Sequence, residues 1–469
     1  MAFIIRIQKC VIIRDCAVIG GEKGSKYAER VKIASAHLSV IDARTDKASM
    51  HHMNRAPVLP CSDTPLIKGL KTMNTKLTVL AAAVAASAGL AQAGSDLSLT
   101  RSHALVNDAS GYDSLLANTN ASNVKVKAQV QARYQYNKRD DAALGDNDTT
   151  MGFSLRRTKV EVSGDVTDNI SGKVKFAFSR STGAAALEDA YGKWKVNDDL
   201  TLKIGQFKQA LIREENLSSS KQLAAERSAV NETFNQDFSQ GIEAHFGGDS
   251  WRGAVGFTDG FNSDNTAFNS SSEADYALNA RFEMLFGDAE WSQFDQFTSW
   301  RGSNAGGMVG AAIAYQSMGS TNPALANDAT MTTGTIDFSY VGDGWNFYAA
   351  GIWRNMDAGG AAVDMDDFGV VAQGGIFVSD QDEIFGRYDG VFPDSNNAPA
   401  DEDFNAITAG WNHYFTPESH AAKFTLEVSY YLDATSTSIV ATSGSGGHNL
   451  LTSTEDGQLG ITAQMQFLF

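Results

Sequence analysis

The chain of 469 residues is acidic, with 55 Asp and Glu against 38 Lys and Arg and a formal net charge of −17. This balance argues against nucleic acid as a partner, because phosphate backbones are bound by basic surfaces. The 3 cysteines, Cys10, Cys16 and Cys61, form no CxxC or Cys/His pattern, which argues against a metal or redox site built on them.

Residues 73–93 have the pattern of a secretory signal peptide. One charge, Lys76, precedes a short apolar stretch that ends in Ala91-Gln-Ala93, so cleavage is predicted after Ala93. Because signals begin a chain, we interpret residues 1–72 as a mis-assigned upstream extension. The apolar stretch is shorter than the roughly 20 residues of a membrane-spanning helix, and no longer apolar run follows it, which argues against a helical membrane protein.

The predicted mature chain, residues 94–469, holds 25 Lys and Arg against 49 Asp and Glu and has no cysteine. Export without disulfides is typical of an envelope protein whose fold is stable without covalent links. Residues 94–123 are rich in Ser, Ala, Asn and Leu and are predicted to be a periplasmic lead-in to the folded domain, residues 124–469.

Alternation of apolar and polar residues begins at Val124 and continues through Tyr136, with Lys, Gln and Arg between the apolar positions. A stretch this long exceeds the average strand of about 5–6 residues and suits a tilted membrane strand of about 9–11 residues. The same pattern predicts sixteen strands, near residues 124–138, 151–166, 170–181, 187–196, 200–209, 238–247, 250–259, 273–287, 307–317, 332–341, 345–355, 366–378, 383–392, 403–415, 421–432 and 457–469.

The connections between these strands alternate in length, with short polar turns such as residues 167–169 and long loops such as residues 433–456. This layout is typical of an outer-membrane barrel. We therefore predict an all-β fold, a transmembrane antiparallel β-barrel of about 16 strands, with hydrocarbon outside and electrolyte within on every strand. A soluble sandwich is the alternative. The connection 288–306 is long where a short turn is expected, and the pattern does not explain it.

The first five strands carry cations on the face opposite the apolar one. On the second strand, the apolar residues around Phe153 have odd numbers and those around Val160 have even numbers, so a regular strand would place them on opposite faces. One extra residue at Arg156-Arg157, a β-bulge, returns both sets to the outer face and directs both guanidiniums inward. The predicted pore-lining, anion-binding cations of these strands are Lys125, Lys127, Arg133, Arg156, Arg157, Lys159, Lys173, Lys175, Lys193, Lys195 and Lys203. The alternative is that they are ordinary wetted charges, neutralised by acids of later strands such as Glu243 and Asp389.

Residues 210–237 form the longest connection and are predicted to fold inward as the third long loop, which narrows the pore. The loop carries Arg213, Lys221 and Arg227, and Lys208 lies at the strand end before it. These four cations are predicted to lie at the constriction.

Three segments, "LRRTKVEVSGDVTDNISGKVKFAF", "LEDAYGKWKVNDDLTLKIGQFKQALIREENLSSS" and "ERS" at 226–228, together resemble the phosphate-selective porin O and P family. The resemblance implies a sixteen-stranded outer-membrane barrel, typically a homotrimer, that passes anions along ladders of arginine and lysine. It implies pore-lining roles for Arg156, Arg157, Lys203 and Lys208. The loop begins "QALIRE" here, where the family has a Pro-Phe-Gly turn.

The leading functional hypothesis is a passive channel for small anions, with phosphate implied by the resemblance. A general or cation-preferring porin and a structural or adhesive barrel are the alternatives. The partners expected are the outer-membrane bilayer, small inorganic anions, further copies of the chain, and the barrel-assembly machinery, which would read the terminal strand ending at Phe469. No catalytic, metal-binding or cofactor-binding pattern was found, so no enzyme activity is predicted.

Overall fold

The computed structural model describes residues 124–139, 149–268, 270, 273–318, 329–359, 363–397, 400–436, 438–440 and 450–469. The predicted extension, signal peptide and lead-in (residues 1–123) lie outside the described residues. Among the residues that are described, every helix is too short or too polar to span a bilayer.

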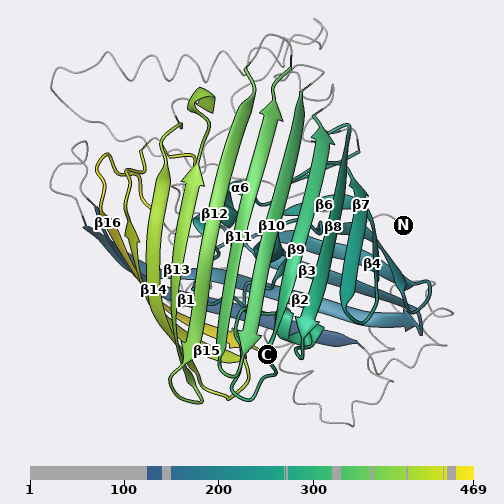
Figure 1. Ribbon diagram of the computed structural model, residues 1–469, viewed down its shortest axis with the longest axis horizontal. Coiled ribbons are helices and arrows are strands. Elements are labelled where there is room, and N and C mark those ends of the chain that lie inside the picture. Colours follow the sequence, from purple (N-terminus) through teal and green to yellow (C-terminus); the bar gives the residue numbers. More distant parts are fainter. Residues whose placement is uncertain are drawn as a thin grey trace, which may run out of the picture. The chain divides into compact units, whose positions relative to one another are not determined.

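The described residues form sixteen strands that close into one antiparallel barrel, in which β1 pairs with β16 (Figure 1). All sixteen predicted strands are confirmed. Their bounds are β1 Lys125–Lys138, β2 Thr149–Thr167, β3 Ile170–Phe178, β4 Ala185–Lys195, β5 Leu200–Lys208, β6 Phe238–Gly247, β7 Trp251–Thr258, β8 Tyr276–Gly287, β9 Gly306–Ser317, β10 Thr330–Gly342, β11 Trp345–Asp357, β12 Met365–Phe377, β13 Asp382–Phe392, β14 Phe404–Tyr414, β15 Ala422–Tyr431 and β16 Gln458–Leu468. The closed cylinder excludes the soluble sandwich.

The barrel wall exposes apolar side chains on its outer face and buries polar ones on its inner face, which is the reverse of a soluble protein. On β1 the polar Gln131 and Arg133 are buried, whereas on β2 Phe153 is 87% exposed and on β5 Ile204 is 62% exposed. Large apolar side chains exposed on strand after strand indicate an outer surface that contacts hydrocarbon.

Two β-bulges place adjacent charged residues on the inner face. Opposite β1, the pairing passes from Arg157 to Leu155, so Arg156 is the extra residue, as predicted. Opposite β3, it passes from Asp189 to Leu187, so Glu188 is the extra residue on β4. Each bulge lets two consecutive side chains point to one side, which a regular strand forbids.

The β5–β6 loop, residues 209–237, contains two short helices, α5 (Arg213–Asn216) and α6 (Ala229–Phe234). The Ser228 side chain caps α6 by accepting from the backbone N of Asn231 at 2.9 Å. Ser228 Oγ also donates to Glu214 Oε2 at 2.6 Å. The beginning and the end of the loop are therefore linked to each other, and α6 lies behind the strands β11 and β12 in Figure 1.

An apolar core lies between this loop and the inner faces of the later strands. It joins Val230 and Phe234 of α6 to Tyr348 on β11, Val371 on β12 and Val391 on β13, all of them buried. Gly369 on β12 makes room for α6, because a Cβ at this position would lie 2.6 Å from Phe234 and 2.7 Å from Val230. The prediction that every inner face meets electrolyte is therefore wrong for these strands, since the loop covers their inward apolar residues.

The connection 288–305, which the sequence pattern did not explain, packs against the same part of the wall. It contains the 3-10 helix η2 (Trp291–Phe294). Thr298 Oγ1 and Tyr414 Oη lie 2.9 Å apart, and Ser299 Oγ donates to the carbonyl of Gly342 at 2.6 Å. The backbone N of Phe297 donates to the carbonyl of Lys221 at 3.1 Å, so this connection also contacts the β5–β6 loop.

Candidate functional site

The β5–β6 loop contacts inward-facing side chains on both sides of the barrel. Arg213 Nε donates to Ser339 Oγ on β10 at 3.0 Å, and six residues later Ser219 Oγ accepts from Gln129 Nε2 on β1 at 3.2 Å. Strands β10 and β1 lie on nearly opposite sides of the barrel in the order of the sheet. The loop is then held along β14 and β15, where Asn412 donates to the carbonyl of Leu223 at 3.0 Å and Lys423 to that of Gln222 at 2.8 Å.

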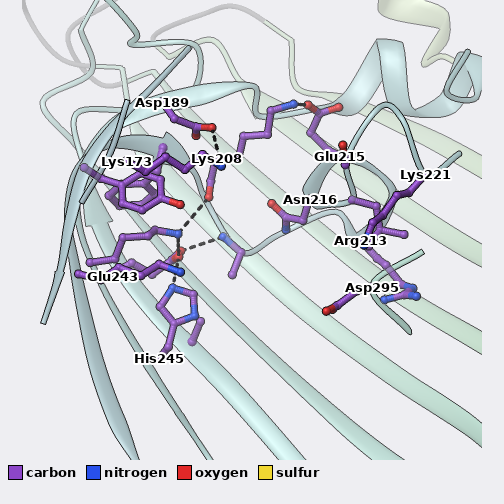
Figure 2. A pocket seen from close by; sticks show the side chains of 18 of the residues that line it. Lys173, Asp189, Lys208, Arg213, Glu215, Asn216, Lys221, Glu243, His245 and Asp295 are labelled. Atoms are coloured by element: carbon purple, nitrogen blue, oxygen red, sulfur yellow. Dashed lines mark hydrogen bonds and ion pairs between the residues drawn. The ribbon is translucent and has the colours of Figure 1, made fainter. Parts of the chain in front are cut away.

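A cavity of about 1390 Å³ lies between this loop and the inner face of strands β1 to β8. Its lining includes twelve Lys and Arg side chains against nine Asp and Glu side chains, in a chain with a net charge of −17. Figure 2 shows Lys173, Glu243 and His245 on the wall side and Arg213 and Lys221 on the loop side. An anion in the cavity would thus meet an excess of positive charge from two directions.

All three lysines of β2 and β3 are paired with carboxylates of β2 and β4. Lys159 Nζ lies 2.5 Å from Glu188 Oε1, and Lys175 Nζ lies 2.9 Å from Glu188 Oε2. Lys173 Nζ is shared between Glu161 at 3.1 Å and Asp189 at 3.2 Å. The bulge on β4 therefore places its two acids where they neutralise lysines of the neighbouring strands.

Glu243 on β6 connects the wall to the start of the loop. Its carboxylate accepts from Lys203 Nζ at 2.8 Å and from the backbone N of Ala210 at 2.8 Å, and it lies 2.8 Å from His245 Nε2. Lys208, at the end of β5, forms an ion pair with Glu215 of α5. These contacts fix the position at which the loop leaves the wall.

Three lining cations have no acidic partner in contact among the described residues: Lys193 on β4, and Arg213 and Lys221 in the loop, of which Arg213 donates instead to Ser339 and to the carbonyl of Phe294. Lys193 Nζ lies 5.6 Å from the centre of the Tyr191 ring, which Lys173 and Lys203 also approach, at 5.8 Å each. Because a neutralised lysine attracts an anion less than a free one, Lys193 and Lys221 are the cavity cations best placed to attract a mobile anion.

The Glu226 carboxylate is surrounded by three arginines. It forms ion pairs with Arg133 on β1 and with Arg156 and Arg157 on β2, the last with Nη2 at 2.7 Å from Oε2. Burial by itself would raise the pKa of Glu226, but the charges of Arg133, Arg156 and Arg157 outweigh it and hold this pKa well below its usual value. The carboxylate is therefore ionised at neutral pH.

Of the fifteen predicted site residues, ten line the cavity: Lys127, Lys159, Lys173, Lys175, Lys193, Lys203, Lys208, Arg213, Lys221 and Arg227. Besides Lys208, two of these ten also anchor the loop. Arg213 Nη2 donates to the carbonyl of Phe294 at 2.6 Å, and Arg227 Nη2 donates to that of Leu217 at 2.7 Å.

The other five predicted residues are not part of the cavity lining. Arg133, Arg156 and Arg157 are turned toward Glu226 instead. Lys125 is exposed at the start of β1. Lys195 forms an exposed ion pair with Asp198 of the following turn at 2.7 Å, because it lies at the last position of β4.

Three acids of the site, Glu188, Asp189 and Glu226, were not singled out in the sequence. Glu188 and Asp189 could have been found as adjacent acids that break the alternation of β4, in the same way as Arg156-Arg157 break that of β2. Glu226 lies in a loop without periodicity, and its contacts to β1 and β2 join residues 69 to 93 positions apart. Such contacts depend on the closed barrel and leave no local pattern.

The chain matches one protein family and is similar to solved structures of outer-membrane proteins. The model of the phosphate-selective porin O and P family matches residues 124–469. No curated protein matches the chain. Among solved structures, the trimer form of in-vitro folded OmpT, an outer membrane protein of Vibrio cholerae, is 15% identical with a TM-score of 0.50, and the match covers 74% of this chain and 99% of that chain. Salmonella typhi OmpF in complex with daunomycin is 12% identical with a TM-score of 0.50, and the match covers 75% of this chain and 99% of that chain.

Proposed function

Because the chain belongs to the phosphate-selective porin O and P family, we propose that this porin is a passive outer-membrane channel for small anions, with phosphate and other oxyanions as its preferred ions. The observation that carries this proposal is the cavity between the β5–β6 loop and strands β1 to β8, in which cations outnumber acids. A narrow aqueous space with a positive excess concentrates anions and repels cations.

The paired lysines of the wall suit passage better than tight binding. An oxyanion that enters loses water, and hydrogen bonds from ammonium groups such as those of Lys173, Lys193 and Lys203 replace that water. Lys173 and Lys203 are held by carboxylates at 2.8–3.2 Å, so they keep part of their charge engaged and bind the passing ion weakly. An ion must be able to leave for current to flow.

The reversal potential of the protein in a planar bilayer, with a potassium chloride gradient across it, tests the proposal. We expect a potential of the sign that anion selectivity gives, and a reduced chloride current when phosphate is added. A reversal potential of the opposite sign would reject the anion channel.

A general or cation-preferring porin is the second candidate, because Glu161, Glu188, Asp189 and Glu243 lie among the wall lysines. If these carboxylates control the field in the cavity, the same experiment gives a cation-selective or unselective potential. Absence of any conductance would instead favour a structural or adhesive barrel.

The proposal includes the setting in which the channel works. We place it in the bacterial outer membrane as a homotrimer, after export by the signal at residues 73–93. The backbone of Phe469 exchanges two hydrogen bonds with Ala128 of β1, at 2.6 and 3.1 Å, and so completes the closing seam that the barrel-assembly machinery would form. Chemical cross-linking in isolated membranes tests the oligomeric state, with a species of three chains as the expected product.

A further inference from the structure

The contacts of Glu226 are those of a bound anion. Arg157 contributes Nη2 at 2.7 Å from Oε2 and Nη1 at 3.3 Å from Oε1. Arg156 approaches both oxygens as well, with Nη2 at 3.2 Å from Oε2 and Nε on Oε1, and Arg133 pairs with Oε1. Two carboxylate oxygens thus accept from three guanidiniums, and such forked contacts are the ones by which arginine recognises carboxylates and phosphates.

The arginines are held in place by groups other than Glu226. Arg133 Nε donates to Gln464 Oε1 at 2.5 Å and its Nη2 donates to the carbonyl of Ala225 at 2.6 Å. Arg157 Nη1 donates to Gln131 Oε1 at 2.9 Å. Arg156 is the extra residue of the bulge, so its direction is set by the backbone of β2. The donors would therefore still converge if the carboxylate were removed.

The charges around Glu226 are unbalanced in favour of the arginines. One carboxylate contacts three guanidiniums; Glu226, Arg133 and Arg157 are buried, and Arg156 is 16% exposed. Two further acids act on the arginines at longer range, Glu427 on Arg133 and Glu232 on Arg156. Glu427 Oε2 accepts from the backbone N of Ala225 at 2.8 Å. Loss of the Glu226 carboxylate would leave buried positive charge without compensation.

The geometry points to an oxyanion site made by Arg133, Arg156 and Arg157, whose resident occupant is the chain's own Glu226 carboxylate. Small oxyanions from solution, such as inorganic phosphate or acetate, would bind at the same site, because their oxygens can accept hydrogen bonds from the same guanidiniums. Glu226 excludes them while the loop is in place. It thereby keeps these three arginines from trapping the ions that pass, and Glu226 becomes a specificity-determining residue of the channel.

The variant Glu226→Ala tests this inference by vacating the site. Thermal unfolding of the purified full-length protein is followed while phosphate is added at constant ionic strength with chloride as the balancing ion. The melting temperature of the variant should rise by several degrees once phosphate exceeds its dissociation constant about a hundred-fold. The wild-type protein should not respond, and acetate should act on the variant as phosphate does.

Two further proteins keep the experiment decisive. Glu226→Ser also removes the carboxylate and shortens the side chain, so it vacates the site as well and should respond to phosphate if Glu226→Ala fails to fold. Glu455→Ala removes an exposed acid far from the arginines in the sequence and should behave like the wild type. Equal responses of wild type and variants, or no response from either Glu226 variant, would overturn the inference.

The role of Glu226 in specificity rests on the proposed channel function, whereas the oxyanion site itself does not, and the two fail in different ways. A cation-selective reversal potential combined with phosphate binding by Glu226→Ala would reject the channel proposal and keep the oxyanion site. An anion-selective potential without a phosphate response from the Glu226 variants would do the reverse. Both measurements use the same purified protein.

Discussion

The inner wall of the barrel has two regions that differ in what faces them. Strands β1 to β8 face the aqueous cavity, whereas strands β11 to β13 face the apolar underside of the β5–β6 loop. Both regions show the same alternation along the chain, because both present exposed apolar side chains on the outer surface. Alternation of apolar and polar residues therefore predicts that the two faces of a strand differ, but it does not predict whether the inner face contacts water or apolar side chains.

The two regions also differ in the groups that pair with their Lys and Arg side chains. Facing the cavity, Lys159 and Lys175 pair with Glu188 of the same wall. On the covered side, Lys423 donates to the carbonyl of Gln222, and Arg387 Nη1 donates to that of Glu226 at 2.7 Å. Arg387 Nε also donates to Asp389 of its own strand at 2.9 Å, so on the covered side carbonyls of the loop add to a strand carboxylate. Loss of the loop would remove one acceptor each from the buried Lys423 and Arg387.

The largest expected effect comes from Phe234, which packs against the covered region. It is 2% exposed and lies over Gly369 and beside the guanidinium of Arg354, at 4.8 Å. Phe234→Ala should lower the free energy of unfolding in guanidinium by about 3–5 kcal/mol, because it leaves a void in a dry interface. Phe268→Ala is the matched control, since Phe268 is fully exposed. Equal losses in both variants would mean that the loop is not packed on this wall.

A second, smaller effect is expected from pH, acting through Glu226 where the loop meets β1 and β2. Its pKa in the folded protein lies well below the value of about 4.3 in an unfolded chain. The stability it contributes, about 1.5–3 kcal/mol, is therefore complete above pH ~4.3 and is lost as the pH falls through the folded pKa. The difference in unfolding free energy between wild type and Glu226→Gln should be constant from pH 8 to pH ~5 and shrink in stronger acid. A difference that grows on acidification would contradict this assignment.

The third and smallest effect tests which part of β4 faces the cavity. Lys193 and Lys195 lie on the same face of β4, but Lys193 lines the cavity and Lys195 pairs with Asp198 at the exposed end of the strand. Lys193→Glu should lower the anion-to-cation permeability ratio roughly three-fold to ten-fold, because it replaces a positive by a negative charge in the cavity. Lys195→Glu should change the reversal potential much less. Similar shifts in both variants would place the selective region at the rim.

Predictions from the sequence succeeded where local geometry decides the outcome. Period-two alternation and turn residues located every strand, and the broken parity between Phe153 and Val160 located the bulge at Arg156. The inward direction of Lys159, Lys173 and Lys203 follows from the same rule, and all three line the cavity. Each of these properties is set by residues that are neighbours in the chain or in the pairing of strands.

Predictions failed where the outcome depends on contacts between distant segments. Arg156 and Arg157 point inward as expected, but an acid of the loop meets them there. Burial of Tyr348 and Val391 on an inner face depends on where α6 lies, which no strand pattern encodes. The packing of residues 288–305 against β10 and β14 has the same origin.

The apolar packing of the loop has a further consequence for the ions that pass beside it. A slab of Val, Leu and Phe side chains on one side of the cavity polarises far less than water does. An ion near such a boundary is pushed away from it by its own image charge, and the field of the opposite lysines spreads less into the slab than it would into solvent. In the proposed channel, the loop would therefore keep the ion path close to the lysines of β3 to β5 without touching the ion, and a polar loop of the same shape would not.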